Sequence, residues 1–547
     1  MIKKLTLELS RLTKQCVLAL DEDLKRAYDQ TERFVKEMSL RRFGVPEDMI
    51  EWIMEFDRGN CNVVLTAYGE SDSFVKAFEA EMGAWAQGDD FSPIGWVVTM
   101  DWLVSVVRLA STCPVRVGNA IIDAILYADD ASYLQRAINA IQGVLRSPED
   151  IPRAIDAIQQ VADATERYCG FTGHQIRVDK SALQMLLYVQ TTGGVMLVPK
   201  AQLPTLYLRR WQSATTQDTW GVELGPATPF PLVGPYDELR HLGHTESAMG
   251  TAPIAKKLAL LSTRQAARIM NMKRLQSSGA KYIAEAVIRA RAQYRLIYLN
   301  ATVAEIDQHQ ASISRMLCKA AHAPYNLPNL LKYGSRGGMH WDKWSDVVNI
   351  ERLLIVMKGI NSPGATGQLL LASIDQLQKM MGASIPIMEV PVGHLVTTGI
   401  QKYNTWIFNV WKWMTHHNRA VSVVGLPAGY TPKREGDANI VEYVSINAPL
   451  GSNQTRADMV ATIQLGCYAL DVHVLSDLYM KDGVNLKVFM LPGEAASRKH
   501  PGWYSAVCFV ISNRPSLGDW IVPTPAIRLG DVVCRVTRSG EPVSYTH

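Results

Sequence analysis

Acidic residues at the ends of two predicted strands constrain the fold of this chain most strongly. Val17 to Leu20 is apolar and runs directly into Asp21-Glu22-Asp23, which is typical of a strand with an acidic end. Ile121 to Tyr127 and Ser132 to Leu134 flank Ala128-Asp129-Asp130, which predicts two strands joined by a tight acidic turn. If the first strand lies beside this hairpin, the two acidic groups meet.

Helices and strands alternate through the first 250 residues, which predicts an α+β fold for this part of the chain. The expected elements are helices through Trp52 with a turn at 43–46, a strand at Asn62–Tyr68, a buried helix at Ile94–Leu109 with Ser92 as N-cap, and a helix at Ile151–Tyr168. A second strand pair is expected before about Gly243.

A chain of 547 residues is too long for a single hydrophobic core. After residue 250 the secondary structure that the sequence predicts changes twice. Residues 251–330 follow the helical period almost throughout, and 331–426 are again mostly helical after a Gly-rich break. Beyond about Pro427, short β-like runs at Ile440–Ile446, Lys487–Met490 and Val507–Ile511 predict a separate β-rich C-terminal region. We therefore predict domains at 1–250, 251–330, 331–426 and 427–547.

Composition favours a soluble intracellular protein in the nucleus or cytoplasm. Apolar residues make up 47% and charged residues 20%, as in ordinary globular proteins. The eight cysteines include no C-x-x-C pair, which suits a reducing compartment. The charged N-terminus does not resemble a signal peptide, and no unbroken run of ~18 apolar residues predicts a membrane span.

Positive charge is concentrated in one segment although the net charge is only +4. Between Lys256 and Arg295 there are ten Lys or Arg residues and one acid, Glu285. Such a stripe is typical of a surface that follows phosphates, and it is also typical of a solvated helix face. The charge pattern alone leaves both interpretations open.

The acidic clusters suit a site for two divalent cations. Phosphoryl transfer uses two cations ~3.5–4 Å apart, and Mg²⁺ prefers one or two protein carboxylates plus substrate phosphates. Asp23 and Asp129 are the predicted principal ligands, with Asp130 beside them. Each cluster taken alone is also explained as a helix cap or an exposed turn.

The clusters, in their order and spacing, resemble the palm motifs of reverse transcriptases. Asp23–Asp29 is similar to motif A, Gln87–Pro93 to motif B and Tyr127–Asp130 to motif C. The Gln-Gly-Asp form of motif B is typical of non-LTR (LINE-type) retrotransposons. Gly173–Ser181 is similar to motif D and Leu239–Gly243 to motif E.

This resemblance implies a right-hand polymerase palm with partial fingers, then a helical thumb and a helical connection. It implies an RNA-directed DNA polymerase that extends a DNA primer with dNTPs on an RNA template. Asp23, Asp129 and Asp130 would bind two Mg²⁺ ions, with Mn²⁺ as an alternative. Lys180 would protonate the departing pyrophosphate, although a surface lysine explains it nearly as well.

Further residues take substrate roles by the same resemblance. Tyr28 would lie under the nucleotide sugar, or it is a core aromatic residue. Gln87 and Gly88 would line the nucleotide and template pocket, and Leu242-Gly243 would hold the primer end. The thumb residues that would contact phosphates are Lys256, Lys257, Arg264, Arg268, Lys273 and Arg274.

Three departures from the family motivate a rival interpretation. Asp23 lies only 22 residues after Met1, so we expect a chain without the family's upstream fingers and endonuclease. Gly83 and Gln87 are one residue further apart than usual, and Arg177 or Val178 stands where motif D usually has Asn. The rival is a decayed or domesticated copy that binds nucleic acid without polymerising. A group II intron-type enzyme is a third alternative, and Asp89 counts against it.

Overall fold

The computed structural model divides the chain into two compact units. The first comprises Met1–Gln376 and Tyr403–His417, and the second comprises Leu377–Lys402 and Asn418–His547. The structure describes residues 1–25, 31–59, 61–66, 69–76, 92–127, 130–137, 140–141, 143–191, 194–213, 222–241, 244–273, 275–334, 338–384, 386–390, 404–423, 432–447, 453–470, 472–479, 507–508, 510–511, 517, 533–536 and 542–545.

A five-stranded sheet lies at the centre of the first unit, in the order β15-β10-β1-β7-β6. Its strands are β1 (Val17–Asp23), β6 (Ala124–Tyr127), β7 (Asp130–Arg136), β10 (Ala182–Leu186) and β15 (Leu232–Val233). The central strand β1 is antiparallel to both β7 and β10, and β6 and β7 form the predicted hairpin. The α+β class is therefore confirmed, as are the strand before Asp23 and the antiparallel pair on either side of residues 128–129. The predicted strand Ile121–Tyr127 is instead divided at Asp123 between β5 (Ala120–Ile122), which pairs with β4 (Val115–Val117), and β6.

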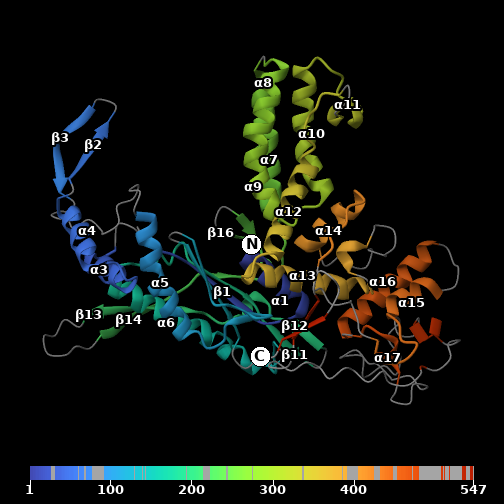
Figure 1. Ribbon diagram of the computed structural model, residues 1–547, viewed down its shortest axis with the longest axis horizontal. Helices are drawn as coiled ribbons and strands as arrows, with labels where there is room; N and C mark the ends of the chain where they lie inside the picture. The colour runs from blue at the N-terminus through green and yellow to red at the C-terminus, as the bar shows by residue number, and fades with distance from the viewer. Residues whose placement is uncertain are drawn as a thin grey trace. The chain divides into compact units, whose positions relative to one another are not determined.

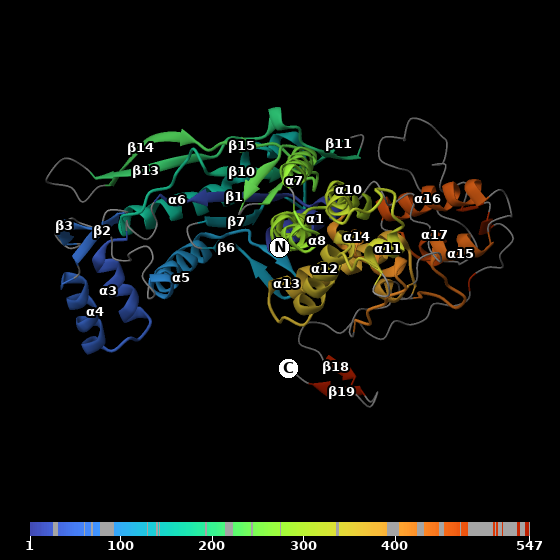
Figure 2. The same cartoon turned by 90° about the horizontal axis from the view of Figure 1, so that it is seen from above.

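Helices α1 (Ile2–Thr13) and α6 (Asp156–Thr172) cover opposite faces of this sheet. Successive strand residues point to opposite faces. The ammonium group of Lys3 in α1 pairs with Asp21, whereas Glu166 of α6 lies near Glu22. The sheet is thus a buried middle layer, and Figure 2 shows its strands extending beside α6.

Helix α5 (Ser92–Ala110) packs on α6 at the position predicted for a buried helix. The helix exists, but Ser92 is its first residue rather than a preceding cap, and Ile94, Val97 and Leu109 are exposed. By length and composition, α5 is the one helix among the described residues that could cross a membrane, with 39% of that span buried. A core helix of a soluble protein passes the same test.

Smaller elements surround the sheet. They are α3 (Arg33–Arg42), α4 (Glu47–Gly59), and the strand pairs β2 (Cys61–Thr66) with β3 (Gly69–Lys76), β4 (Val115–Val117) with β5 (Ala120–Ile122), β13 (Tyr207–Ser213) with β14 (Val222–Pro229), and β16 (Leu239–His241) with β17 (His244–Glu246). A second sheet has the order β12-β11-β9-β8, with β8 (Ala140–Ile141), β9 (Val144–Leu145), β11 (Tyr188–Thr191) and β12 (Gly194–Leu197).

The predicted helical character of 251–330 and of the segment after it is confirmed. Figure 1 shows α7, α9 and α10 side by side. The bundle contains α7 (Pro253–Met272), α8 (Ser277–Tyr282), the π-helical η4 (Ile283–Arg289), α9 (Ala290–Tyr298), α10 (Val303–Ala320), α11 (Asn329–Tyr333), α12 (Trp344–Ile360), and α14 (Trp406–His416). Helix α13 (Ala365–Met381) continues from the first unit into the second.

The strands predicted at Ile440–Ile446 and Val507–Ile511 in the C-terminal region are wrong, because the described residues there are helical. Ile440–Asn447 forms α15, and residues 507–508 and 510–511 are also helical; Lys487–Met490 lies outside the described residues. The Asn439 side chain accepts hydrogen bonds from the amides of Val441 and Glu442, which supports the first helical turn. Tertiary packing overrides the β-branched composition here, because Ile440, Val441 and Val444 enter a buried core.

The remaining elements of the second unit are also mainly helical. Among its described residues they are the 3-10 helix η5 (Ile387–Glu389), α16 (Asn453–Leu470), α17 (Leu475–Leu478), and the strand pair β18 (Val533–Val536) with β19 (Pro542–Tyr545).

A fully buried arginine on α12 holds the C-terminal end of α9. The Arg352 side chain is 0% exposed and donates to the side-chain oxygen of Asn349 at 3.0 Å. It also donates, at 2.7–3.2 Å, to the carbonyl oxygens of Leu296, Ile297, Leu299 and Ala301. Burial lowers the pKa of Arg352 to about 10, so the side chain stays charged at neutral pH. Helix C-terminal carbonyls favour a nearby positive charge, so the guanidinium replaces missing backbone donors.

Replacing this residue tests its role in stability. Arg352→Lys should lower the free energy of unfolding by roughly 2–5 kcal/mol, because an ammonium group cannot reach all five acceptors. Urea unfolding followed by tryptophan fluorescence measures the change. The exposed Arg315 on α10 gives a matched control, Arg315→Lys, for which we expect less than about 0.5 kcal/mol. Equal effects of the two substitutions would contradict this role.

Candidate active site

The end of β1 lies directly opposite the start of β7. In the antiparallel register, Asp23 faces Asp130 and Asp21 faces Ser132. Facing residues in an antiparallel pair point to the same side of the sheet. Asp21, Asp23 and Asp130 therefore share one face, and Asp130 also closes the β6–β7 hairpin opposite Tyr127. Strand pairing thus brings two of the three predicted ligands together.

The segment after α6 brings two cationic side chains to Asp23. Gly173 ends α6 with a φ of 81°, a left-handed conformation that favours glycine and turns the chain back toward the sheet. The amide of Arg177 donates to the Asp23 carbonyl at 2.9 Å. The side chains of Arg177 and Lys180 lie 3.7 and 3.8 Å from Asp23 Oδ2. The predicted proton donor Lys180 therefore lies beside the predicted metal ligand.

Asp21 is held by protein groups rather than exposed at the strand end. Ser132 Oγ donates to Asp21 Oδ1 at 2.5 Å, and the Lys3 ammonium group pairs with Oδ2. Sequence reasoning missed Lys3, because nothing in the local pattern predicted that α1 folds back over β1. The period-two alternation of a strand was the one available signal that Asp21 and Asp23 share a face.

Glu22 points to the opposite face and is buried against α6. Burial, reinforced by the nearby Glu166, raises the pKa of Glu22 well above its ordinary value, whereas Tyr133 acts in the opposite direction. Burial therefore favours the protonated form of Glu22 more than that of an exposed glutamate. Glu22 is not a metal-ligand candidate, because it faces away from Asp23 and Asp130.

The raised pKa of Glu22 predicts a pH-dependent stability. The pKa of Glu22 is higher in the folded state than in the unfolded state. The contribution of Glu22 to the free energy of unfolding is therefore complete below its unfolded-state pKa, and it is lost as pH rises through its folded-state pKa. Glu22→Gln, which keeps the shape but cannot ionise, should raise the melting temperature at pH 8 more than at pH 4. Melting curves from pH 4 to 9 test this. As a control, Glu55→Gln on the exposed face of α4 should leave the melting temperature unchanged at both pH 4 and pH 8.

The two carboxylates that the strand pairing brings together are groups that Mg²⁺ prefers as ligands. Asp23 and Asp130 provide two carboxylates on one face, which matches the number that Mg²⁺ usually takes from protein when phosphates complete its coordination. Among the residues that the structure describes, no group of three His, Cys, Asp or Glu side chains could hold a metal ion. Asp129, the third predicted ligand, lies outside the described residues.

Several other predicted site residues cannot be placed. Tyr28, Gln87, Gly88, Leu242, Gly243 and Arg274 lie outside the residues that the structure describes. For Leu242-Gly243 the neighbouring strands are described: β16 pairs antiparallel with β17, and His241 faces His244. The described strands on either side of Leu242-Gly243 therefore pair with each other, and the predicted role of these two residues stays a prediction.

The basic residues of α7 divide into two groups. Lys257, Arg264 and Arg268 are exposed, and their spacing of seven and four residues places them on one helix face. Lys273 is exposed just after the helix. Lys256 instead donates to the Asn300 carbonyl at 2.6 Å and to both carboxylate oxygens of Glu305 at 2.9 and 3.0 Å. Its ammonium group thus joins two parts of the bundle.

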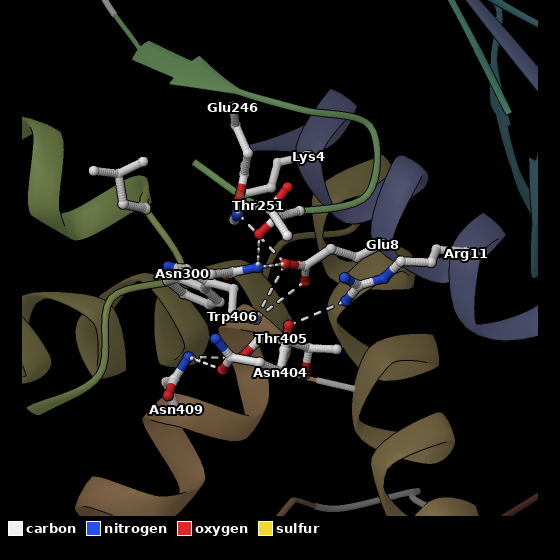
Figure 3. Close-up of polar contacts among 12 residues, drawn as sticks. Lys4, Glu8, Arg11, Glu246, Thr251, Asn300, Asn404, Thr405, Trp406 and Asn409 are labelled. Carbon is white, nitrogen blue, oxygen red and sulfur yellow. Dashed lines mark hydrogen bonds and ion pairs between the residues drawn. The ribbon is translucent and has the colours of Figure 1, made fainter. Parts of the chain in front are cut away.

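A buried carboxylate on α1 connects the sheet layer to the bundle (Figure 3). Glu8 is 3% exposed and accepts from Asn300 Nδ2 at 2.7 Å and from the Trp406 amide at 3.1 Å. Lys4 lies 3.4 Å from Glu8 and binds both carboxylate oxygens of Glu246, at the end of β17, at 2.6 Å. Helix α1 is therefore bonded to the β16–β17 hairpin, the end of α9 and the start of α14.

Comparison with known proteins adds no assignment to this geometry. No protein-family model matches the chain, and no curated protein matches it.

Proposed function

We propose that this chain is an RNA-directed DNA polymerase of the non-LTR retrotransposon type. The observation that carries the proposal is the strand register that sets Asp23 opposite Asp130. Asp129 precedes Asp130 in the sequence. The ordered motifs around these residues support the same interpretation. Its substrates would be an RNA template, a DNA primer and dNTPs.

Asp23 and Asp130, which share one sheet face, would hold two Mg²⁺ ions together with Asp129. Bound there, the ions supply positive charge that stabilises the attacking and leaving oxygens of nucleotidyl transfer. Lys180, 3.8 Å from Asp23 Oδ2, would donate a proton to the departing pyrophosphate from beside the metal-binding carboxylates. Arg177 adds a second positive charge at the same strand end.

The helical bundle would act as the thumb. The exposed basic face of Lys257, Arg264 and Arg268 on α7 suits the phosphates of a template–primer duplex. Exposed apolar side chains at Ile254, Leu258 and Leu261 lie on the same helix and suit packing against sugars.

Primer extension on an RNA template tests the catalytic assignment. Asp23→Asn and Asp129→Asn should each reduce Mg²⁺-dependent synthesis on the order of 10²–10³-fold or more, because the charge that holds the metal ions is lost. Affinity for the template–primer duplex should change little. As matched control, Asp101→Asn removes an exposed α5 carboxylate that pairs with Arg42, and it should retain full activity.

Two results would count against the proposal in different ways. Substantial synthesis by Asp23→Asn would remove Asp23 from the site. Tight duplex binding by the unaltered chain, without any metal-dependent product, would favour the decayed or domesticated copy over an active polymerase.

Salt dependence tests the basic face of α7. Replacing Lys257, Arg264 and Arg268 together by Gln should weaken duplex binding and reduce the slope of log K against log salt by about 2–3, near 0.9 for each lost phosphate contact. Fluorescence anisotropy between 50 and 300 mM KCl measures this slope. The control triple replaces exposed basic residues elsewhere, Arg58, Arg153 and Lys358, and should leave it nearly unchanged. Equal slopes for both triples would exclude α7 as the phosphate-binding face.

A further inference from the structure

An uncovered apolar stripe runs along helix α4. The exposed fractions of Met49, Trp52 and Phe56 are 52%, 68% and 63%, and the Trp52 and Phe56 rings stack with their centroids 6.0 Å apart. Spacings of three and four residues place these side chains on one side of the helix, whereas Ile50 points into the protein. Clustered large apolar side chains in contact with water typically mark a surface that another molecule covers.

An acidic stripe lies directly beside the apolar one. Asp48, Glu51 and Glu55 are exposed, and each immediately precedes one of the three apolar residues in the sequence. Helix α4 contains five acids and a single basic residue, Arg58, which donates to Glu55 at 3.0 Å. The stripe therefore repels an anionic partner such as a nucleic acid or an anionic membrane surface. A partner that covers both stripes needs positive charge beside apolar surface.

Helix α7 of the same chain has the complementary surface. Lys257, Arg264 and Arg268 form an exposed basic stripe, and the helix contains no acid. Exposed apolar residues lie beside this stripe. They are Ile254, Leu258, Leu261, Ile269 and Met272. Because α4 and α7 are exposed in this way in the same molecule, they do not cover each other within one chain.

Other charged groups next to these two helices are bonded to partners of their own. Arg41 donates to Glu47, at the start of α4, at 2.8 Å, and Lys256 donates to Glu305 at 2.9 Å. Glu238 accepts from two backbone amides in the first turn of α7 at 2.6 and 2.8 Å. These pairs leave the two stripes with opposite net charge.

The order of the stripes determines how the two helices can pack. On α4, Trp52 directly follows Glu51, and on α7, Leu258 directly follows Lys257. Because both helices are right-handed, the rotation from the charged stripe to the apolar stripe has the same sense on each. Two helices with the same order bring acid against base, and apolar against apolar, only when they run antiparallel.

The spacing of the charges matches in this antiparallel arrangement. Asp48 and Glu55 are seven residues apart, as are Lys257 and Arg264, which is roughly 10.5 Å along either helix. Arg264 can therefore lie against Asp48 while Lys257 lies against Glu55. We propose that a second copy of this chain covers α4 with its own α7, packed antiparallel.

The contact buries the basic face of α7 that the proposed function assigns to template–primer phosphates. Self-association and duplex binding then exclude each other, because both need Lys257 and Arg264. The inference goes beyond the proposed function and does not rest on it, since association needs no metal, primer or template. Reciprocal contacts close a two-fold dimer, whereas a one-way contact extends to a longer assembly.

Exchanging the charges of the two helices tests this contact. The variant Asp48→Lys, Glu51→Lys makes α4 basic, and the variant Lys257→Glu, Arg264→Glu makes α7 acidic. The unaltered chain should associate with a dissociation constant on the order of 10 µM, because a helix pair buries less area than a standard interface.

Either variant alone should associate at least about tenfold more weakly, since like charges then face each other. An equimolar mixture of the two variants should associate as the unaltered chain does, because each helix again meets the opposite charge. Sedimentation velocity of the full chain measures these dissociation constants.

Two further variants serve as controls. Glu149→Lys with Glu435→Lys reverses two exposed acids on other elements and should leave the dissociation constant unchanged. Trp52→Gln removes the largest side chain of the apolar stripe and should weaken association about tenfold. Its melting temperature should change little, because Trp52 is 68% exposed. Melting temperatures of all variants distinguish a lost contact from a lost fold.

Several results would overturn the proposal. The unaltered chain could stay monomeric at about 100 µM, ten times the expected dissociation constant. Both charge variants could retain the association, or their mixture could fail to associate. A monomeric chain that binds vesicles of phosphatidylserine and phosphatidylcholine, and loses this binding in Trp52→Gln, would show that a membrane covers α4 instead.

Duplex binding distinguishes this inference from the proposed function. The α4 charge variant leaves α7 intact, so it should bind the template–primer duplex at least as tightly as the unaltered chain. A chain that associates through the exchanged charges but binds no duplex contradicts the proposed function alone. A chain that binds duplex and polymerises but never associates contradicts this inference alone.

Discussion

The buried carboxylate of Glu8 is the interaction on which the arrangement of the first unit depends. It binds Asn300 after α9 and the Trp406 amide at the start of α14, two points far from each other and from α1 in sequence. The N-terminus of a helix favours a negative charge, and the Asn300 amide supplies a further donor. Removing either partner would leave part of a buried charge uncompensated, so the three segments hold one another in place.

Helix α1 carries this constraint to the candidate active site. Lys3 on the same helix pairs with Asp21, two residues before Asp23 on β1, and Lys4 binds Glu246 at the end of the hairpin. Arg352 fixes the other side of the same junction by occupying the last carbonyls of α9. A few buried charges, each with several partners, therefore connect the acidic strand end to the helix that bears the basic face.

The local sequence pattern correctly predicted those helices and strands whose hydrophobic period and terminal residues indicate the same structure. The apolar run before Asp23, the acidic turn of the hairpin and the helical period of 251–330 all predicted the observed elements. Prediction was wrong at Ile440–Ile446, where β-branched residues form α15 because its first turn is capped and its apolar side chains enter a core. Lys256 belonged to the predicted basic stripe, yet its bonds to Glu305 and Asn300 depend on a packing partner that sequence does not reveal.

By itself, the sequence determined which residue types stand at the ends of β1 and the hairpin, and hence that carboxylates of Asp23 and Asp130 were candidates for one site. Only the tertiary structure decided how the neighbouring acids differ. Asp21 is neutralised by Lys3, Glu22 is buried on the far face with a raised pKa, and Asp23 lies near Arg177 and Lys180. The physical reason is that charge and burial depend on long-range contacts, whereas strand period and turn chemistry are local.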